Sequence, residues 1–391
     1  MSRFSRLFLT EWKRLFYDKT IRNIVFLVPI LYMTLFGFLY IEKKVTEIST
    51  VLVDADQSEL SRELSRAFDA DETFAVTAIA ATEAEAMKLV EEGEARVALI
   101  IPAGLEKNVK TGREAEVLTV IDGSNMLISN AAVRAANSVI KTVSAGATLK
   151  KLEASGIWGE EGKTLYTGID FRYRVLYNPT FSYLTFMVFG LAGTVLQQVL
   201  FLGVALSVSQ EKEQGTWART ISSNSFFLIT ACKLLPYLLA GTFNMFLGFA
   251  LLLKGFGIPY YGSVADLMLV ATLFNLAVAT IGYMISYLFR DQLQSTQIAM
   301  LIAVPSFMLS GYTWPLESMP AAVEAIGKSL PLTYFLDGVR EILTKGHGLS
   351  AVKQDLLVLA FMSALSLFVA YLIYQFQKRK ALKLNPESDA V

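Results

Sequence analysis

Six long apolar runs constrain this chain more than any other feature of its sequence. Each is close to the length that a helix needs to cross the hydrocarbon of a bilayer, roughly 20 residues, and each is uncharged over its central part. Within a bilayer the backbone polar groups must bond inside the segment, so such runs form helices. The expected spans are Ile24–Ile41, Phe181–Ser209, Leu234–Leu253, Leu267–Phe289, Gln292–Leu316 and Leu356–Gln377. We therefore predict a polytopic α-helical membrane protein with six transmembrane helices, kinked at Pro29, Pro236 and Pro305.

The composition agrees with a membrane location and excludes several classes of protein. Of the 391 residues, 53% are hydrophobic and 18% are charged, and mean hydropathy is +0.45. Soluble domains have about a quarter of their residues charged. The formal net charge is zero, so nothing favours binding to nucleic acid. Cys232 is the only cysteine and His347 the only histidine, which excludes an internal disulfide and a Cys/His metal site.

Lys and Arg gather at both ends of the chain, and this distribution predicts its orientation. Short cytoplasmic segments of membrane proteins are enriched in these residues. Residues 1–22 and the tail 378–391 are basic, and six spans put both ends on one side, so both termini are expected in the cytoplasm. Phe4, Phe8, Trp12 and Phe16 recur at helical spacing within residues 1–22. That pattern predicts an amphipathic interfacial helix along the inner leaflet, followed by the first span at 23–41.

A polar insert, residues 42–178, separates the first two spans and is expected outside the cytoplasm. Strand-like runs occur at Thr50–Asp54, Arg96–Ile101, Glu116–Ile121 and Ile169–Tyr177. Helices are expected after the first strand, from a capping box of Thr82 and Glu85, and over about Asn125–Ser155. We predict that the insert is a small extracytoplasmic α/β domain.

The stretch "GIWGEEGKT" (Gly156–Thr164) ends like a phosphate-binding loop. Such a loop requires four residues between its first glycine and the Gly-Lys pair, so that backbone N–H groups surround the phosphate. Here five residues separate Gly156 from Gly162, and the insert is expected on the side where ATP is scarce. We interpret the stretch as a turn, and expect this chain to have no ATPase site, no catalytic residues and no cofactor of its own.

The uncharged cores of the six spans contain no ionisable residue, which argues against a proton-driven carrier. They do contain neutral amides, namely Gln197, Gln198, Asn244, Asn275 and Gln297. Amide side chains commonly join membrane helices by hydrogen bonds, which is the first interpretation. The second is that some of them line a path for an amphipathic substrate, and the sequence leaves both open.

The loop at about 210–227, between the second and third spans, combines acidic residues with a helix start. Glu211, Glu213, Gly215, Thr216 and Trp217 lie in "QEKEQGTW", and "KLLPYLL" leads back into the membrane. The two stretches are similar to the Glu-x-Glu-x-Gly-Thr loop and the Lys-Leu-x-Pro entry of type-2 ATP-binding-cassette (ABC) export permeases. "VLVDADQSELSRELSRAFDA" (Val51–Ala70) and "MLSGYTWPLESMPAAVEAIGKSLPLTYFLDGVREILTKG" (Met308–Gly346) resemble segments of their drug-efflux-like branch. Trp217 and "ARTISSNS" depart from the commoner pattern of the loop.

The resemblance implies the membrane-spanning subunit of an ABC exporter in a bacterial inner membrane. In such permeases the loop after the second span is a coupling helix that docks on a separate cytoplasmic ATPase, which holds the ATP and Mg²⁺. We expect Glu211 and Glu213 to meet basic groups of that ATPase, Gly215 to permit the turn, and Trp217 to fill an apolar pocket there. A second permease chain, identical or not, is the other expected partner, and a periplasmic adaptor is a further candidate. The expected substrate is hydrophobic or amphipathic.

Helix breakers mark the segment 314–353, between the last two spans. Four residues accompany a break in helix formation in and next to this segment: Gly311, Trp314, Pro315 and Pro331. Irregular backbone at membrane depth must be shielded by protein. The resemblance implies short external or re-entrant helices that cap the substrate exit, with these four residues in the cap.

The alternative from a different class is a membrane-anchored receptor or adhesin whose insert binds a ligand without transport. One span would anchor such a domain. Six spans, a structured cytoplasmic loop and the external helix breakers favour transport instead. Co-purification with an ATPase separates the two hypotheses.

Overall fold

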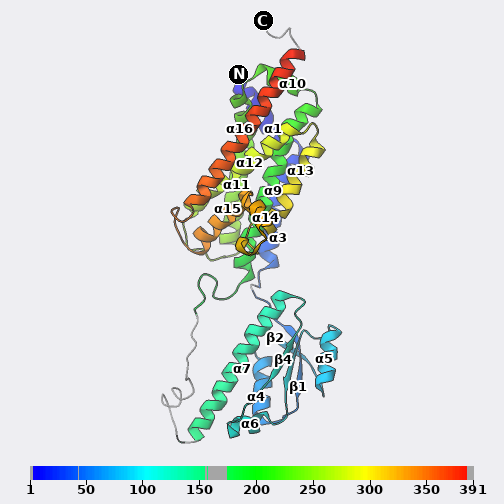
Figure 1. The fold of residues 1–391 in the computed structure, drawn as a ribbon, viewed down its shortest axis with the longest axis vertical. Coiled ribbons are helices and arrows are strands. Elements are labelled where there is room, and N and C mark those ends of the chain that lie inside the picture. Colours follow the sequence, from blue (N-terminus) through cyan, green and yellow to red (C-terminus); the bar gives the residue numbers. More distant parts are fainter. Residues whose placement is uncertain (1–2, 43, 155, 157–173, 385–391) are drawn as a thin grey trace. The chain divides into compact units, whose positions relative to one another are not determined.

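The computed structural model describes residues 3–42, 44–154, 156 and 174–384. The chain forms two units (Figure 1). The helical unit contains Met1–Lys43 and Leu176–Val391, and the α/β unit contains Lys44–Val175. The insert predicted at 42–178 is therefore a compact unit of its own, with a sheet and covering helices. The stretch Gly156–Thr164 lies, apart from Gly156, outside the described residues.

The helical unit begins with four short elements that follow one another closely: α1 (Arg3–Tyr17), α2 (Lys19–Arg22), the π-helix η1 (Asn23–Leu27) and α3 (Val28–Leu39). After the insert come α9 (Tyr183–Glu213), α10 (Trp217–Ser223), α11 (Phe226–Ala250) with the π-turn η2 (Leu251–Gly255), and α12 (Val264–Leu288). The last elements are α13 (Gln292–Leu309), η3 (Leu316–Ser318), α14 (Ala321–Lys328), α15 (Pro331–Val339), η4 (Arg340–Thr344) and α16 (Lys353–Leu384).

Four helices in the described residues are long and apolar enough to cross a membrane: Tyr183–Glu213, Phe226–Gly255, Val264–Leu288 and Lys353–Leu382. They correspond to four of the six expected spans. The first expected span appears as a shorter apolar helix, Asn23–Leu39. The fifth was expected to reach Leu316, and this prediction is wrong, since α13 ends at Leu309. Gly311, with φ of +80°, takes the chain out of the helix direction there.

The core of the helical unit lies around α12, which contacts α9, α11, α15 and α16. α12 is buried along most of its length. Glycines on α9 allow close approach of its neighbours: a Cβ at Gly190 would lie 2.6 Å from the Tyr312 ring, and one at Gly193 would lie 2.9 Å from the Phe335 ring. Small residues at helix contacts are typical of membrane bundles, because dispersion contacts replace the hydrophobic effect there.

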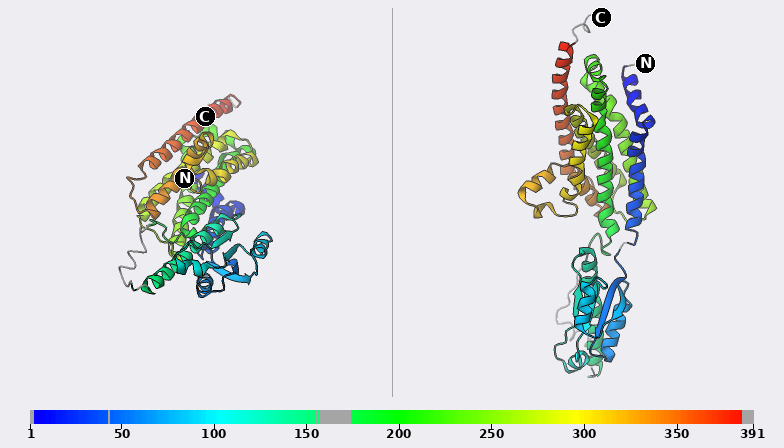
Figure 2. Two further views of the ribbon diagram at one scale, coloured as in Figure 1. Left: turned by 60° about the horizontal axis from the view of Figure 1, so that its bottom comes forward. Right: turned by 90° about the vertical axis from the view of Figure 1, so that its right-hand side faces the viewer.

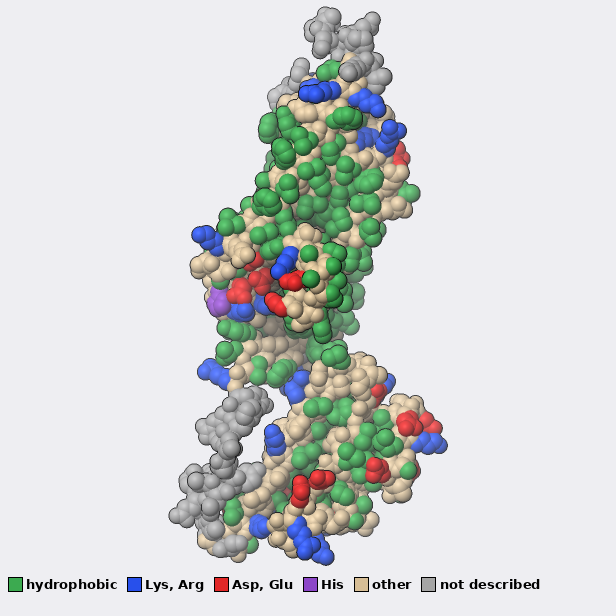
Figure 3. All heavy atoms as spheres, viewed as in Figure 1, with side chains coloured by type: hydrophobic (Ala, Val, Ile, Leu, Met, Phe, Trp, Pro, Cys, Tyr) green, Lys and Arg blue, Asp and Glu red, His purple; other side chains and the backbone are tan. Residues whose placement is uncertain are grey.

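The outer surface of the helical unit is apolar, as a bilayer requires. Large side chains on one face of α16 are between 49% and 64% exposed: Leu357, Phe361, Leu365, Phe368 and Leu372. Figure 3 shows hydrophobic side chains over much of the visible side of this unit, with Lys and Arg near the end that holds the termini. Several apolar helices and this surface identify a helical membrane protein.

The start of α1, the end of α16 and α10 lie at one end of the helical unit, which we call the terminal end (Figures 1 and 2). α14 and α15 lie toward the opposite end. α1 packs lengthwise against α11, and its rings Phe4, Phe8, Trp12 and Phe16 contact one another in sequence at 5.4–5.8 Å. In Figure 2 the column from α1 to α3 keeps nearly one direction. That α1 lies along a leaflet stays a prediction.

The α/β unit is a four-stranded sheet of order β2-β1-β3-β4 between helices. Its strands are β1 (Ile48–Asp54), β2 (Phe74–Ile79), β3 (Val97–Ile101) and β4 (Leu118–Ile121). β1 pairs in parallel with β2 and β3, and β3 pairs antiparallel with β4. Its helices are α4 (Glu59–Asp69), α5 (Glu83–Glu91), α6 (Leu105–Thr111) and α7 (Met126–Ala154). α4 and α7 contribute to the core on one face of the sheet and α5 to the core on the other.

Local signals account for most of these elements. Thr82 accepts from the amide of Glu85, and the Glu85 carboxylate accepts from the amide of Ala81, which confirms the predicted cap of α5. β2 was not predicted; only Phe74 of its six residues is buried, and Thr77 interrupts its short apolar run. Of the strand expected at Ile169–Tyr177, residues 169–173 lie outside the described residues and 174–177 form no strand.

Candidate functional site

At the terminal end, α9 finishes in a turn that reverses the chain. The amide of Gly215 donates to the Lys212 carbonyl at 3.1 Å, and the amide of Thr216 donates to the Glu211 carbonyl at 2.9 Å. These two bonds, with φ of +72° at Gly215, define a Schellman motif. The predicted turn at Gly215 is present, and it leads directly into α10.

α10 is held to the bundle by Trp217. Its ring is 7% exposed and meets the Tyr287 ring of α12 edge-on at 5.3 Å. Its Nε1 donates to Oε1 of Gln377 on α16 at 2.9 Å, and Gln377 donates in turn to the Tyr287 carbonyl. In this structure the chain itself supplies the pocket that Trp217 fills, and contact of Trp217 with another protein stays a prediction.

The two acidic residues of the loop also bind within the chain. Glu213 accepts from the backbone and side-chain N–H groups of Gln292, at 3.3 and 2.9 Å, and so joins α9 to the start of α13. Glu211 was expected to be exposed, and this is wrong: its side chain is 18% exposed and accepts from Lys233 at 2.6 Å. Of the pair, Glu213 alone is exposed. Contact of either residue with an ATPase stays a prediction.

Lys233, at the centre of this end, forms a buried ionic cluster that joins three helices. Its side chain is 3% exposed, and its ammonium group donates to Glu11 on α1 and to Glu211 on α9, each at 2.6 Å. The third donor goes to the Ser207 carbonyl at 2.7 Å. Arg14 adds an ion pair with Glu11 at 3.6 Å, so the two carboxylates face two cations. We call Glu11, Arg14, Glu211 and Lys233 the charge cluster.

This cluster was missed at the sequence level. Lys233 lies among apolar residues of α11, a pattern that is also typical of a lysine whose ammonium group reaches the membrane interface. Glu11 interrupts the apolar stripe of α1 and was a usable signal, because an acidic residue on the packed face of a helix needs a cation. Its partner is 222 residues away in sequence, so nothing local identified it.

A groove beside α10 is lined by cations and apolar side chains. It has a volume of about 560 Å³ and lies among α10, α12 and α16. Lys212, Arg290 and Lys380 line it, along with Trp217 and Ile221. The Lys212 ammonium group donates to the carbonyls of Ser286, Tyr287 and Phe289, and so satisfies the C-terminal end of α12. Thr216, Ala218 and Arg219 are exposed next to this groove.

The five amides of the spans differ in their surroundings. Asn244 is buried and donates to the Val25 carbonyl at 2.7 Å. Pro29 has no N–H to bond that carbonyl, so Asn244 satisfies a group that the proline leaves free. For Asn244 this favours the first interpretation, an amide that joins helices. Gln198 is half-buried and Gln297 is exposed on α13.

Gln197 and Asn275 are buried with polar atoms that no described residue satisfies. Gln197 is 1% exposed, and neither its side-chain oxygen nor its side-chain nitrogen has a hydrogen-bond partner among the described residues. The side-chain nitrogen of Asn275 is also buried without a hydrogen-bond partner there. Buried unpaired amides are costly, so water or a ligand is needed to satisfy them. That the five amides line a substrate path stays a prediction.

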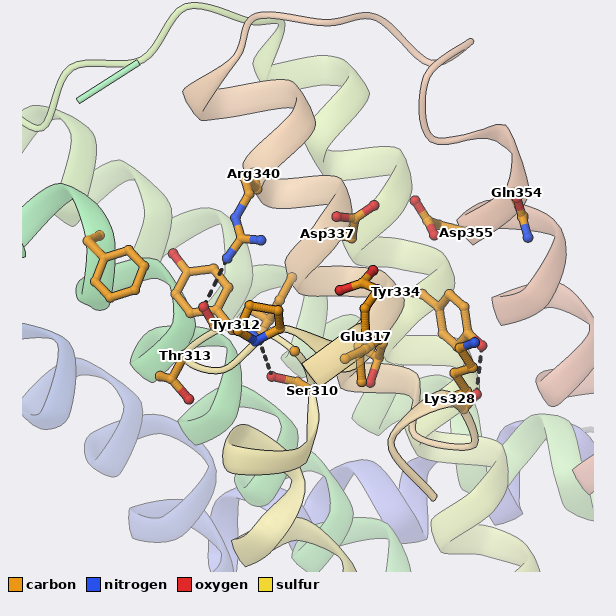
Figure 4. A pocket seen from close by; sticks show the side chains of 16 residues that line it. Ser310, Tyr312, Thr313, Glu317, Lys328, Tyr334, Asp337, Arg340, Gln354 and Asp355 are labelled. Carbon is orange, nitrogen blue, oxygen red and sulfur yellow. Dashed lines mark hydrogen bonds between the residues drawn. The ribbon is translucent and has the colours of Figure 1, made fainter. Parts of the chain in front are cut away.

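The exit segment forms a pocket between α9, the 310–317 loop, α15 and the start of α16. We call it the exit-segment pocket; its volume is about 690 Å³ (Figure 4). Gly311 and Pro315 line it, Trp314 is 58% exposed, and Pro331 is buried at the first position of α15. The loop is held by Arg340, which donates to the Tyr312 carbonyl at 3.0 Å. A capping role for Gly311, Trp314, Pro315 and Pro331 stays a prediction.

Comparison with known proteins identifies a family for this chain. The sequence pattern of ABC-2 family transporter proteins matches residues 19–372. This chain belongs to that family. The match includes the α9–α10 turn, the amides of the spans and the exit segment, whereas Glu11 and Arg14 of the charge cluster and Gln377 and Lys380 of α16 lie outside it.

Relatives of this ABC-2 protein carry names that agree with a transport role. Two are probable multidrug ABC transporter permeases of Escherichia coli K12, YbhR and YbhS. YbhR is 26% identical over 93% of this chain and 96% of its own length, and YbhS is 24% identical over 87% and 88%. YhhJ, an inner membrane transport permease of the same organism, is 26% identical over 79% and 80%. The family and its relatives thus support an ABC permease role for this membrane protein.

Proposed function

We propose that this chain is the membrane-spanning subunit of an ABC exporter, which moves a hydrophobic or amphipathic substrate out of the cytoplasm or inner leaflet. The observation that carries the proposal is the family match, which extends from the start of α2 to residue 372 within α16. The names of YbhR and YbhS support a multidrug substrate range. ATP would be hydrolysed by a separate subunit that holds the nucleotide and Mg²⁺.

The α9–α10 turn is the candidate docking surface for that subunit. Thr216, Ala218 and Arg219 are exposed there, and the neighbouring groove offers Lys212, Arg290 and Lys380. The surface is cationic and partly apolar, so an acidic partner surface with an apolar centre would complement it. Glu211 and Trp217 would then act from inside, by joining the turn to α11, α12 and α16.

The proposed location is a bacterial inner membrane, with both termini in the cytoplasm. The basic tails support this orientation. A second permease chain would pair with this one, and the α/β unit on the other side of the membrane would be free to contact an adaptor. The receptor or adhesin alternative has no comparable support, because the named relatives are permeases.

Reconstitution tests the proposal directly. The chain is co-expressed with an ABC ATPase from the same genome, and the complex is placed in liposomes that contain a hydrophobic fluorescent dye. We expect co-purification of the two chains and dye movement that requires ATP. A matched complex in which the ATPase lacks its phosphate-binding lysine should move no dye. If no candidate ATPase co-purifies with the chain and no ATP-dependent dye movement is seen, the result would favour the receptor alternative.

A further inference from the structure

Two carboxylates in the exit-segment pocket have no partner among the described residues. Asp337 lies on α15 and Asp355 at the start of α16, and in Figure 4 their side chains point toward one another. Asp355 is only 9% exposed, and neither carboxylate accepts a hydrogen bond or forms an ion pair within the described chain. Two neighbouring carboxylates, one of them buried, repel each other and lose hydration, so they favour a positive group between them.

Among the described residues, the cations in and around this pocket form hydrogen bonds and ion pairs with groups other than these two carboxylates. Arg340 donates to the Tyr312 carbonyl, and its guanidinium group lies 4.8 Å from the centre of the Tyr312 ring. Lys328 pairs with Glu324 at 2.6 Å. Lys345 and His347 both bind Glu341. The described part of the chain therefore leaves Asp337 and Asp355 beside the pocket without a closed ion pair.

The rest of the pocket suits an aromatic molecule. The rings of Phe186 and Tyr312 stack at 5.9 Å, and Tyr334 is held in place by its hydroxyl, which donates to the Lys328 carbonyl at 2.6 Å. Thr313 contributes a buried hydroxyl without a partner in the described residues. A volume of about 690 Å³ falls within the usual range for drug-sized ligands, roughly 300–1,000 Å³. Aromatic faces also attract cations.

We propose that the exit-segment pocket binds a drug-sized aromatic organic cation. Its positive group lies between Asp337 and Asp355, and its rings lie against Phe186, Tyr312 and Tyr334. A metal ion fits less well, since the described residues contain no group of three or more His, Cys, Asp or Glu that could hold one. The proposal concerns binding to this chain alone, so it is independent of the ATPase and of the direction of transport.

Equilibrium binding of ethidium to the purified full-length chain in lipid nanodiscs tests this proposal, with empty nanodiscs as the blank. We expect saturable binding, and a Kd raised about tenfold or more in Asp337→Asn/Asp355→Asn, because charged hydrogen-bond partners are lost. The matched control is Asp266→Asn, which removes a carboxylate of α12 outside the pocket and should leave the Kd unchanged. Equal Kd values for the double variant and the unaltered chain would overturn the proposal.

Two further measurements separate the remaining outcomes. Asp337→Asn alone changes an exposed side chain, so it should fold normally and still weaken ethidium binding. The anionic dye 1-anilinonaphthalene-8-sulfonate should not compete with ethidium; competition by it would indicate a general apolar site and contradict the charge argument. Displacement of ethidium by calcium ions at equal concentration would assign the carboxylates to a metal ion and likewise overturn the proposal.

Discussion

Lys233 carries a full charge at a site that is 3% exposed, and its surroundings explain how this is tolerated. Each of its three N–H donors has an acceptor within 2.7 Å. Glu11 and Glu211 compensate its charge, and Arg14 balances the second carboxylate. Removing one member of such a cluster leaves an uncompensated buried charge, whereas removing the charges together does not.

The prediction at this scale is a non-additive effect of neutralising the charge cluster. Lys233→Met should lower the free energy of unfolding by about 3–5 kcal/mol, as expected for a broken buried pair. Adding Glu211→Gln to that variant removes one charge of each sign, leaves Glu11 paired with Arg14, and should recover most of the loss. Thermal unfolding in detergent measures both. Lys254→Met, at an exposed lysine of η2, serves as the control and should change little. Additive losses in the double variant Lys233→Met/Glu211→Gln would contradict this account.

α10 is a seven-residue helix, too short to be stable by itself, so its position depends on tertiary contacts. Trp217 and Ile221 supply its buried side chains. Trp217 joins it to α12 through Tyr287 and to α16 through Gln377. A force applied to the exposed face of α10 would therefore pass to two spans at once, which is the mechanical requirement for a coupling element.

The prediction at the scale of this element is detachment of α10 when its anchor is removed. Trp217→Ala should cost about 3–5 kcal/mol of local packing and speed tryptic cleavage at Arg219, which is exposed on α10. Trp217→Phe keeps most of the ring contact and should change cleavage less. Trp314→Ala is the matched control, because that tryptophan is 58% exposed in the exit segment. Unchanged cleavage in Trp217→Ala would mean that other contacts hold α10.

At the scale of the whole molecule, the start of α1 and the end of α16 lie at the terminal end of the helical unit, together with α10. The chain leaves that unit after α3 and returns to it before α9, so the α/β unit is an insertion between two of its helices. In a membrane this arrangement predicts opposite sides for α10 and the insert.

Labelling with a membrane-impermeant thiol reagent tests this arrangement in intact cells. Cys232 is buried, and Cys232→Ser removes it as a background signal. Asn130→Cys on α7 should react in intact cells, whereas Arg219→Cys on α10 should react only after permeabilisation. Both positions are exposed in their own units, so burial cannot explain a difference between them. The reverse pattern would overturn the proposed orientation.

Much of this protein was predictable from local sequence. Long apolar runs specify helices because a bilayer leaves the backbone no other partner, and four of the runs appear as helices long enough to span it. The turn at Gly215 and the cap at Thr82 follow from bonds between residues a few positions apart. The errors at Leu316, at the missed strand β2 and at the strand expected over 174–177 occur where neighbouring segments rather than local pattern decide the element.

Other features were decided by the tertiary structure alone. Lys233 and Glu11 come from helices 222 residues apart in sequence, and Asn244 reaches a carbonyl 219 residues away. Asp337 and Asp355 meet because α15 and α16 pack together. Hydropathy records how apolar a segment is and says nothing about which side chain of a distant helix will face it. A buried charge or amide is satisfied within the chain only if a distant helix places a partner beside it. The packing of the helices therefore decides which polar groups are paired and which are left for a ligand.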